Sequence, residues 1–281
     1  MNTENNIVKD KLLEIYTTCS TRLQRFEIWP DYYRVRYAEF EKYYTLLPKK
    51  HFAETLEIGC GIGYQASFLS CISDKVTASD VDFGDMIQHS RGLGIAREFI
   101  GESGIRNIEI THANAEQLPF EDEQFDFIYC SYSFQYIPDK DKALQEIKRV
   151  LKKGGYFFCV LPTTAYRVKA LKNYYSIIFK KLPSLLSRLN KKKAVPGNGT
   201  ATAVAAKKHT KLFPPPDDDN NSFLSELYLY SPLRWTKLFK KNGHKIIVKK
   251  YSDFKPGNDP AGSSSMKEVL TSAGIIYITT K

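Results

Sequence analysis

From residue 55 onward, short apolar runs alternate with longer amphipathic stretches. The apolar runs have the length of strands and predict five of them, at 55–58, 75–79, 105–111, 125–130 and 156–161. The amphipathic stretches predict three helices, at 64–71, 86–100 and 139–153. Strands that alternate with helices are typical of βαβ units, in which parallel strands form one sheet with helices on both faces. For the last of these helices, Asp139 is predicted to be the N-cap and Gly154-Gly155 to mark the end.

The segments on either side of this alternation predict further parts of the fold. Aromatic residues near helical spacing in the first fifty residues predict helices that pack on the main domain, and two more strands are expected at 244–250 and 274–279. The fold class is therefore α/β: a Rossmann-like, doubly wound, mostly parallel seven-stranded sheet with helices on both faces. A helical extension precedes it, and a basic helical insertion precedes its last two strands. We expect four units: an N-terminal helical cap (1–54), a core (55–162), an insertion or lid (163–216) and a C-terminal completion of the sheet (217–281).

Composition excludes several classes of protein. The chain has 281 residues, of which 42% are hydrophobic, and its 17 Phe and 18 Tyr exclude disorder of the whole chain. No apolar run reaches the length of a membrane-spanning helix, and the N-terminus lacks the apolar stretch of a signal peptide. Five scattered cysteines without a Cys-x-x-Cys motif predict free thiols and no metal site, so a cytoplasmic location is expected.

The net charge of +10 is local. Residues 163–216 contain twelve Lys or Arg and no acidic residue, which leaves 29 basic and 31 acidic residues elsewhere. Within 165–189, apolar residues recur at three- and four-residue steps among lysines and arginines. Three interpretations remain open: a lid helix on the domain, a helix that makes peripheral contact with a membrane surface, and a patch that binds nucleic acid, in decreasing order of preference.

A glycine-rich turn follows the first predicted strand, at Glu57-Ile58-Gly59-Cys60-Gly61-Ile62-Gly63. Glycines allow a tight turn, close approach of a ligand and amides exposed at a helix N-terminus. Asp80, seventeen residues after Gly63, ends the second predicted strand, where an acid can accept hydrogen bonds from both hydroxyls of a ribose. Position 64 is Tyr, so the dinucleotide fingerprint G-x-G-x-x-G is broken and NAD binding is disfavoured.

Five motifs in order give residues 55–162 a family resemblance. They are the glycine turn, Asp80, the segment Asn114-Ala115-Glu116-Gln117-Leu118-Pro119-Phe120, the strand Phe125-Asp126-Phe127-Ile128 and the turn Leu151-Lys152-Lys153-Gly154-Gly155. Together they resemble the core of class I S-adenosylmethionine-dependent methyltransferases of the broad small-molecule type. The resemblance implies S-adenosyl-L-methionine as the cofactor.

The resemblance also implies roles for single residues. The turn with Gly59, Gly61 and Gly63 is expected to pack on the methionine part of the cofactor, with Glu57 near the ammonium group and Ser131 at the same end. Asp80 is expected to hold the ribose and Val81 to pack on the adenine. The family usually has an acid where this chain has Asn114, whose oxygen can still accept a bond from the adenine amino group. The amide of Ala115 is expected to contact the ring.

The acceptor side carries weaker signals. Tyr136 follows the fourth predicted strand, at the edge where such sheets bind ligands, and Tyr32 and Arg36 would face the acceptor if the N-terminal helices fold over it. His112 is expected to be a packed strand-end residue, and no residue is assigned a catalytic role.

The function expected from the resemblance is methyl transfer to a small or lipid-linked acceptor, such as a saccharide or a quinone-like precursor. Two alternatives stay open: an RNA or DNA methyltransferase recruited by the basic insertion, and a non-catalytic scaffold that binds S-adenosylmethionine. The oligomeric state is not predicted.

Overall fold

A computed structural model describes most of the chain. The described residues are 2–23, 30–81, 92–164, 166–168, 171–172, 175–176, 222–252 and 274–281. Among them, no helix has both the length and the apolar character needed to cross a membrane.

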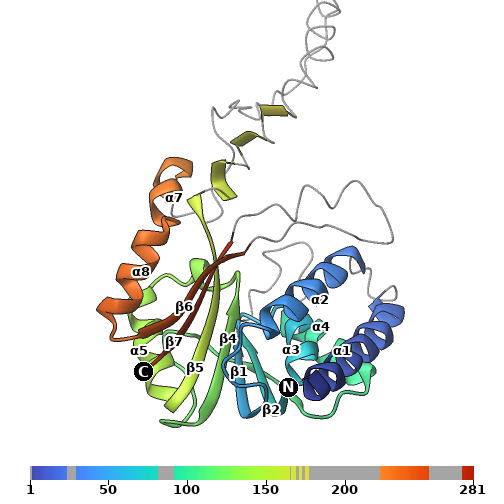
Figure 1. Cartoon of the computed structure of the whole chain (residues 1–281). Coiled ribbons are helices and arrows are strands. Elements are labelled where there is room, and N and C mark those ends of the chain that lie inside the picture. The colour runs from blue at the N-terminus through green and yellow to red at the C-terminus, as the bar shows by residue number, and fades with distance from the viewer. Residues whose placement is uncertain are drawn as a thin grey trace, which may run out of the picture.

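Seven strands form one sheet in the order β3-β2-β1-β4-β5-β7-β6 (Figure 1). Their bounds are β1 Phe52–Ile58, β2 Ser73–Asp80, β3 Ile108–His112, β4 Phe125–Ser131, β5 Leu151–Pro162, β6 Lys245–Ser252 and β7 Gly274–Thr280. The first five strands pair in parallel, and β7 runs antiparallel to both β5 and β6. Parallel pairing puts the carboxyl ends of these five strands at one edge, and the strand order reverses between β1 and β4, the position at which sheets of this kind bind ligands. The predicted fold class is confirmed.

Helices cover both faces of the sheet (Figure 1). One face carries α1 Asn2–Leu23, α2 Pro30–Tyr44, α3 Tyr64–Leu69 and α4 Gly92–Ser103, and the other carries α5 Lys140–Val150 and α8 Pro232–Lys241. Two shorter helices, η3 Phe134–Tyr136 and α7 Phe223–Leu229, follow β4 and precede α8. Each face buries its own apolar cluster, so the sheet is sandwiched between two cores.

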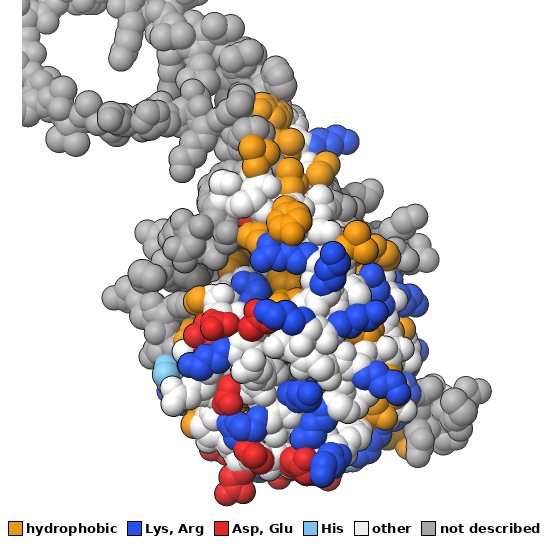
Figure 2. All heavy atoms as spheres, turned by 90° about the vertical axis from the view of Figure 1, so that its left-hand side faces the viewer, with side chains coloured by type: hydrophobic (Ala, Val, Ile, Leu, Met, Phe, Trp, Pro, Cys, Tyr) orange, Lys and Arg blue, Asp and Glu red, His pale blue; other side chains and the backbone are white. Residues whose placement is uncertain are grey.

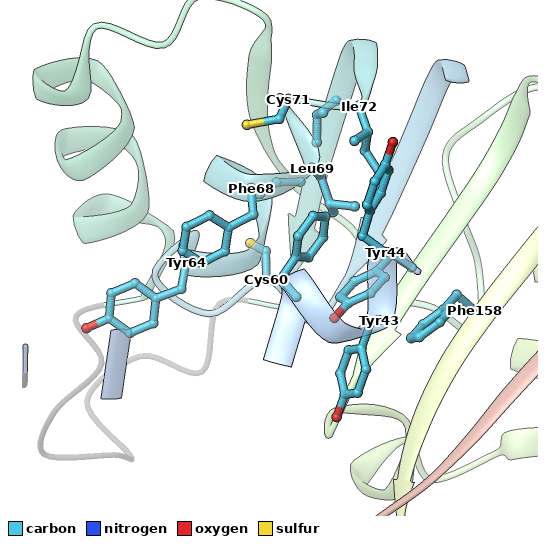
Figure 3. Packing of buried hydrophobic residues seen from close by; sticks show 14 of the residues in the cluster. Tyr43, Tyr44, Cys60, Tyr64, Phe68, Leu69, Cys71, Ile72 and Phe158 are labelled. Carbon is cyan, nitrogen blue, oxygen red and sulfur yellow. The ribbon is translucent and has the colours of Figure 1, made fainter. Parts of the chain in front are cut away.

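The aromatic residues of α1 and α2 belong to the first of these cores. Tyr33 stacks on Phe68 of α3 at 4.9 Å between ring centroids, and its hydroxyl forms a 3.0 Å hydrogen bond with Ser67. Tyr43 lies against Phe158 of β5, with 5.5 Å between the centroids, as Figure 3 shows. The helices expected from the aromatic spacing therefore pack on the main domain, as predicted. The limits of the four predicted units stay a prediction.

The end of α5 differs from the sequence prediction. The helix ends at Val150, and Leu151 already belongs to β5, where it pairs with Phe125. Gly154 and Gly155 lie inside that strand, beside the register shift between Phe125 and Phe127. A Cβ at Gly155 would lie 3.0 Å from the carbonyl oxygen of Asp126, so the glycine pair serves this bulge and not a helix end. Asp139 is confirmed as the N-cap, since its carboxylate accepts a 3.0 Å bond from the amide of Lys142.

Two hydrogen bonds join the chain just before the insertion to the chain after it, and we call this region the stem. Thr164 donates a 2.9 Å hydrogen bond to the carbonyl of Leu227, and Trp235 of α8 donates a 3.1 Å bond to the carbonyl of Pro162. The described parts of 165–189 are helical, and the rest of that stretch lies outside the described residues. Helix α7 was not predicted; a capping box in which Ser222 and Ser225 bond to each other's backbone begins it.

Candidate functional site

The glycine turn joins β1 to α3 with three left-handed residues. Gly59, Gly61 and Gly63 have φ of 75°, 54° and 84°, values that L side chains rarely adopt. A Cβ at Gly59 would overlap the Cβ of Ser133, whose hydroxyl donates a 3.0 Å bond to the Gly59 carbonyl. A Cβ at Gly61 would meet no heavy atom of the described residues within 4 Å. The turn is thus tight against η3 on one side and open to a ligand on the other.

Asp80 connects this turn to the end of β2. Its two carboxylate oxygens accept bonds from the amides of Gly61, at 2.7 Å, and of Val81, at 2.8 Å. Burial raises the pKa of the Asp80 carboxyl, although both amides and the charge of His112 act in the opposite direction. His112 pairs with Asp80 across the two strands and is exposed, so the prediction that it is packed was wrong. Each carboxylate oxygen keeps a further lone pair for a ligand hydroxyl.

Two polar side chains buried around the turn have atoms without a hydrogen-bond partner in any part of the chain that the structure describes. They are Glu57, through its Oε2 atom, and Gln65, through both ends of its amide. Ser131 is half-buried beside them, and its hydroxyl interacts with that of Tyr129. Burial, reinforced by the nearby charge of Asp80, raises the pKa of the Glu57 carboxyl to about 8. Buried polar groups are rarely left unpaired in native proteins, so this set indicates a polar ligand.

The loop after β3 is held against α5. The Glu116 carboxylate accepts a 2.8 Å bond from the amide of Asp139, and Arg149 donates to the carbonyls of Leu118, at 3.0 Å, and Phe120, at 2.8 Å. These bonds set the position of the loop without any ligand.

Within this loop, Ala115 is buried and Asn114 is exposed. The Asn114 side-chain oxygen, expected to face an adenine, accepts a 2.9 Å bond from the amide of Glu116. This bond closes an Asx turn, and the oxygen retains a second lone pair.

The three residues predicted to face the acceptor lie on two elements, α2 and η3. Arg36 forms a largely buried ion pair with Glu39, with 2.7 Å between Nη1 and Oε2, and lies over the ring of Tyr132 at 5.4 Å. Tyr136, on η3, is 46% exposed at the carboxyl end of β4. Tyr32 belongs to α2, and its side chain lies outside the described residues.

Sequence reasoning missed several polar groups on this side. The hydroxyls of Tyr43 and Tyr129 are buried, and that of Tyr43 has no hydrogen-bond partner in the described part of the chain. Burial raises the pKa of Glu39, and the charge of Arg36 opposes that shift. No local motif marks these residues. Gln65 carried a signal, because it is the one amide in a short helix whose neighbours Ala66, Phe68 and Leu69 are apolar.

The part of the chain that carries the turn, Asp80 and the loop after β3 is similar to known proteins. Residues 56–159 match the methyltransferase domain family. The chain carries a class I methyltransferase domain. S-adenosylmethionine is the cofactor of such domains, and the residues present fit it. A Cβ at Gly61 would meet none of the described residues, and the Oε2 atom of Glu57 is buried nearby without a partner among them.

Relatives of this methyltransferase domain extend the comparison. A demethylmenaquinone methyltransferase of Bacillus pumilus is 29% identical over 138 residues, which are 49% of this chain and 56% of that protein. The chain thus matches about half the length of this curated relative.

Two solved structures share the fold of the methyltransferase domain. An S-adenosylmethionine-dependent methyltransferase from Aquifex aeolicus has a TM-score of 0.51 at 17% identity, with coverage of 85% of this chain and 88% of that one. The [4+2]-cyclase SpnF has a TM-score of 0.52 at 14% identity, with coverage of 86% and 79%. The fold therefore does not by itself fix the reaction.

Proposed function

We propose that the chain is an S-adenosylmethionine-dependent methyltransferase and that its acceptor is a small or lipid-linked molecule, first of all a quinone-like aromatic precursor. The Glu57 carboxyl beside the glycine turn carries the proposal. Its Oε2 atom is buried without a hydrogen-bond partner among the described residues, and a cationic amino group would supply that partner. The Bacillus pumilus relative, a demethylmenaquinone methyltransferase, supports the choice of acceptor.

In this proposal the cofactor-side residues have separate tasks. Glu57 binds the ammonium group of the methionine part, and Ser131 lies at the same end. Asp80 accepts bonds from the ribose hydroxyls while it keeps those from Gly61 and Val81. The backbone around Gly59, Gly61 and Gly63 leaves room for the methionine part. Val81, Asn114 and Ala115 contact the adenine.

When bound, S-adenosylmethionine supplies a methyl group that its sulfonium already activates. The chain must therefore align the acceptor oxygen or carbon and exclude water, and both tasks belong to side chains at the α2 and β4 edge. The hydroxyls of Tyr43 and Tyr129 and the pair Arg36–Glu39 offer donors and charge there. A phenolate or enolate acceptor needs little help from a base, so no residue is assigned as one.

Titration calorimetry of the full chain with S-adenosylmethionine tests the cofactor assignment. Asp80→Asn is expected to weaken binding by about tenfold or more, because a charge-assisted hydrogen bond is lost. Asp74→Asn is the matched control, since Asp74 is exposed at the other end of the same strand. Absence of binding by the wild-type chain, or equal affinity of all three proteins, refutes the proposal.

A transfer assay with S-adenosylmethionine labelled on its methyl group tests the acceptor. We expect label in a reduced naphthoquinone offered in detergent and none in RNA or DNA. Label in nucleic acid selects the alternative in which the basic insertion recruits RNA or DNA. A chain that binds the cofactor but transfers methyl to no component of a cell extract is the non-catalytic scaffold.

A further inference from the structure

Helix α7 buries a charged side chain and exposes apolar ones. It buries its carboxylate, Glu226, completely, whereas Leu224 is 57% and Tyr228 is 70% exposed. Leu233, in the first turn of α8, is also 70% exposed. A helix on an aqueous surface normally shows the opposite arrangement. Figure 2 shows hydrophobic side chains gathered on the upper part of this face, beside Lys and Arg side chains.

The stem of the insertion enforces this orientation. Arg167 forms an ion pair with Glu226 at 2.8 Å, and both side chains are almost fully buried. The hydrogen bond from Thr164 to the Leu227 carbonyl attaches the next residue of α7 to the same segment. Rotation of α7 to hide Leu224 would break the ion pair and leave a buried charge, so the apolar side chains stay outside.

The surroundings of these apolar residues are basic. Residues 222–252 contain seven Lys or Arg and one acidic residue, the buried Glu226. The guanidinium of Arg234 lies 5.2 Å from the ring centroid of Tyr228. Lys249 of β6 lies over the ring of Tyr277, whose hydroxyl donates a 2.8 Å bond to the Pro232 carbonyl and so brings Lys249 beside α8.

This surface flanks the edge of the sheet that carries the candidate site. Trp235 of α8 bonds to the last residue of β5, Pro162, so the first turn of α8 lies at the carboxyl ends of the parallel strands. Figure 1 shows α7 at that same edge, across the sheet from α2. A partner that covers α7 is therefore close to the acceptor side.

We propose that this face is a docking surface for an anionic lipid bilayer. We call it the apolar–basic surface and define it by Leu224, Tyr228, Leu233, Arg234, Lys237 and Lys249. Its two leucines and its tyrosine enter the headgroup region, and its cations contact lipid phosphates. Nucleic acid would use the cations but would leave the leucines in water, so the exposed leucines favour the bilayer. The proposal does not depend on methyl transfer, because it rests on this surface alone.

Vesicle co-sedimentation of the full chain, without cofactor, tests the proposal. We expect binding to vesicles of phosphatidylcholine with phosphatidylglycerol, weaker binding to phosphatidylcholine alone, and a decrease with salt. Leu224→Ser with Leu233→Ser is expected to lower the partition coefficient by about tenfold or more. Ile7→Ser with Leu13→Ser is the matched control, because these α1 side chains are 51% and 52% exposed on another part of the molecule, and it is expected to bind as the wild type does.

Several outcomes overturn the proposal. One is a wild-type chain that does not sediment with anionic vesicles, and another is an equal loss in both double variants. A third is vesicle binding that requires Arg234 and Lys237, is unchanged by the leucine substitutions and is abolished by added RNA. That result would indicate a surface that binds nucleic acid. Dimers that the leucine substitutions dissociate would show that a second copy covers the surface. Circular dichroism verifies that each variant folds.

Discussion

The glycine turn and the stem of the insertion lie at the same edge of the sheet but are held in different ways. Backbone atoms make most of the bonds of the turn: the amides of Gly59 and Cys60 donate to the Ser79 carbonyl at 2.8 and 3.0 Å, and the amide of Gly61 donates to the side-chain carboxylate of Asp80. Side chains from distant parts of the chain build the stem, through Arg167 with Glu226 and Trp235 with Pro162.

The two regions are therefore expected to tolerate different substitutions. A backbone-built turn depends on conformation, so it fails when a residue cannot adopt the required φ. A side-chain-built stem depends on chemical partners, so it fails when one member of a pair is removed. Damage to either region should leave the other intact, and the following substitutions test that independence.

The largest effect is expected from the stem. Glu226→Gln leaves the guanidinium of Arg167 buried without its counter-charge, which is expected to lower the free energy of unfolding by about 3–5 kcal/mol. Urea denaturation measures this change. Glu41→Gln is the control, since the exposed pair of Lys9 and Glu41 should contribute less than about 1 kcal/mol.

The same variant tests the independence of the two regions. Where Glu226→Gln remains folded, its affinity for S-adenosylmethionine should equal that of the wild-type chain. A loss of stability no larger than that of Glu41→Gln would show that the ion pair does not hold the stem.

The turn is tested by Gly59→Ala. The new Cβ would overlap Ser133 at a left-handed φ, and the free energy of unfolding is expected to fall by about 2–4 kcal/mol. Gly61→Ala also places a side chain at a left-handed φ, but its Cβ would meet none of the described residues within 4 Å, so a loss of about 1–2 kcal/mol is expected. In the Gly59→Ala variant, the further substitution Ser133→Gly should raise the free energy of unfolding to that of Gly61→Ala. Equal losses in both single variants would contradict the role of the contact with Ser133.

The two regions also differ in how well the sequence predicts them. The turn follows directly after an apolar run, and its glycines and Asp80 stand at fixed spacing, so the strand, the turn and the acid were predicted in order. The stem joins Thr164 to Leu227, 63 residues away, and Trp235 to Pro162, 73 residues away. No local pattern encodes such pairs, because each residue alone is typical of an ordinary helix surface or loop.

Local patterns also fail where tertiary contacts override them. Gly154-Gly155 has the signature of a helix end, yet β5 already begins at Leu151, because a bulge opposite Phe125 needs residues without side chains. Glu39 has the spacing of a solvent-exposed helix residue, yet it is buried with Arg36. On the acceptor side the sequence pointed to Arg36 but not to the partner that orients it.

The next effect depends on pH and concerns the buried carboxyl at the turn. The folded chain retains the proton of Glu57 up to a pH of about 8, whereas an unfolded chain releases it near its ordinary pKa of 4.5. The unfolded state then binds fewer protons, so this group lowers stability as pH rises between these values, by at most about 1.4 kcal/mol per pH unit. Glu57→Gln should remove that slope.

Urea denaturation between pH 5 and 8 measures this slope. Glu54→Gln is the control, because Glu54 lies on the same strand but is only half-buried. Saturating S-adenosylmethionine should also flatten the wild-type curve, since an ammonium group beside Glu57 favours its ionised form. Parallel curves for the wild type and Glu57→Gln would show that the carboxyl is ionised in the folded chain.

The smallest effect tests the loop that completes the cofactor side. Asn114→Ala removes the acceptor of the Glu116 amide and is expected to weaken S-adenosylmethionine binding by about two- to tenfold, because the Asx turn and the adenine contact are both lost. Asn114→Asp keeps the oxygen and should bind at least as tightly as the wild type. Gln117→Ala, an exposed change in the same loop, should have no effect in the calorimeter. If Asn114→Ala alters stability but not affinity, the Asn114 side chain only shapes the loop. Backbone atoms of the loop would then recognise the adenine.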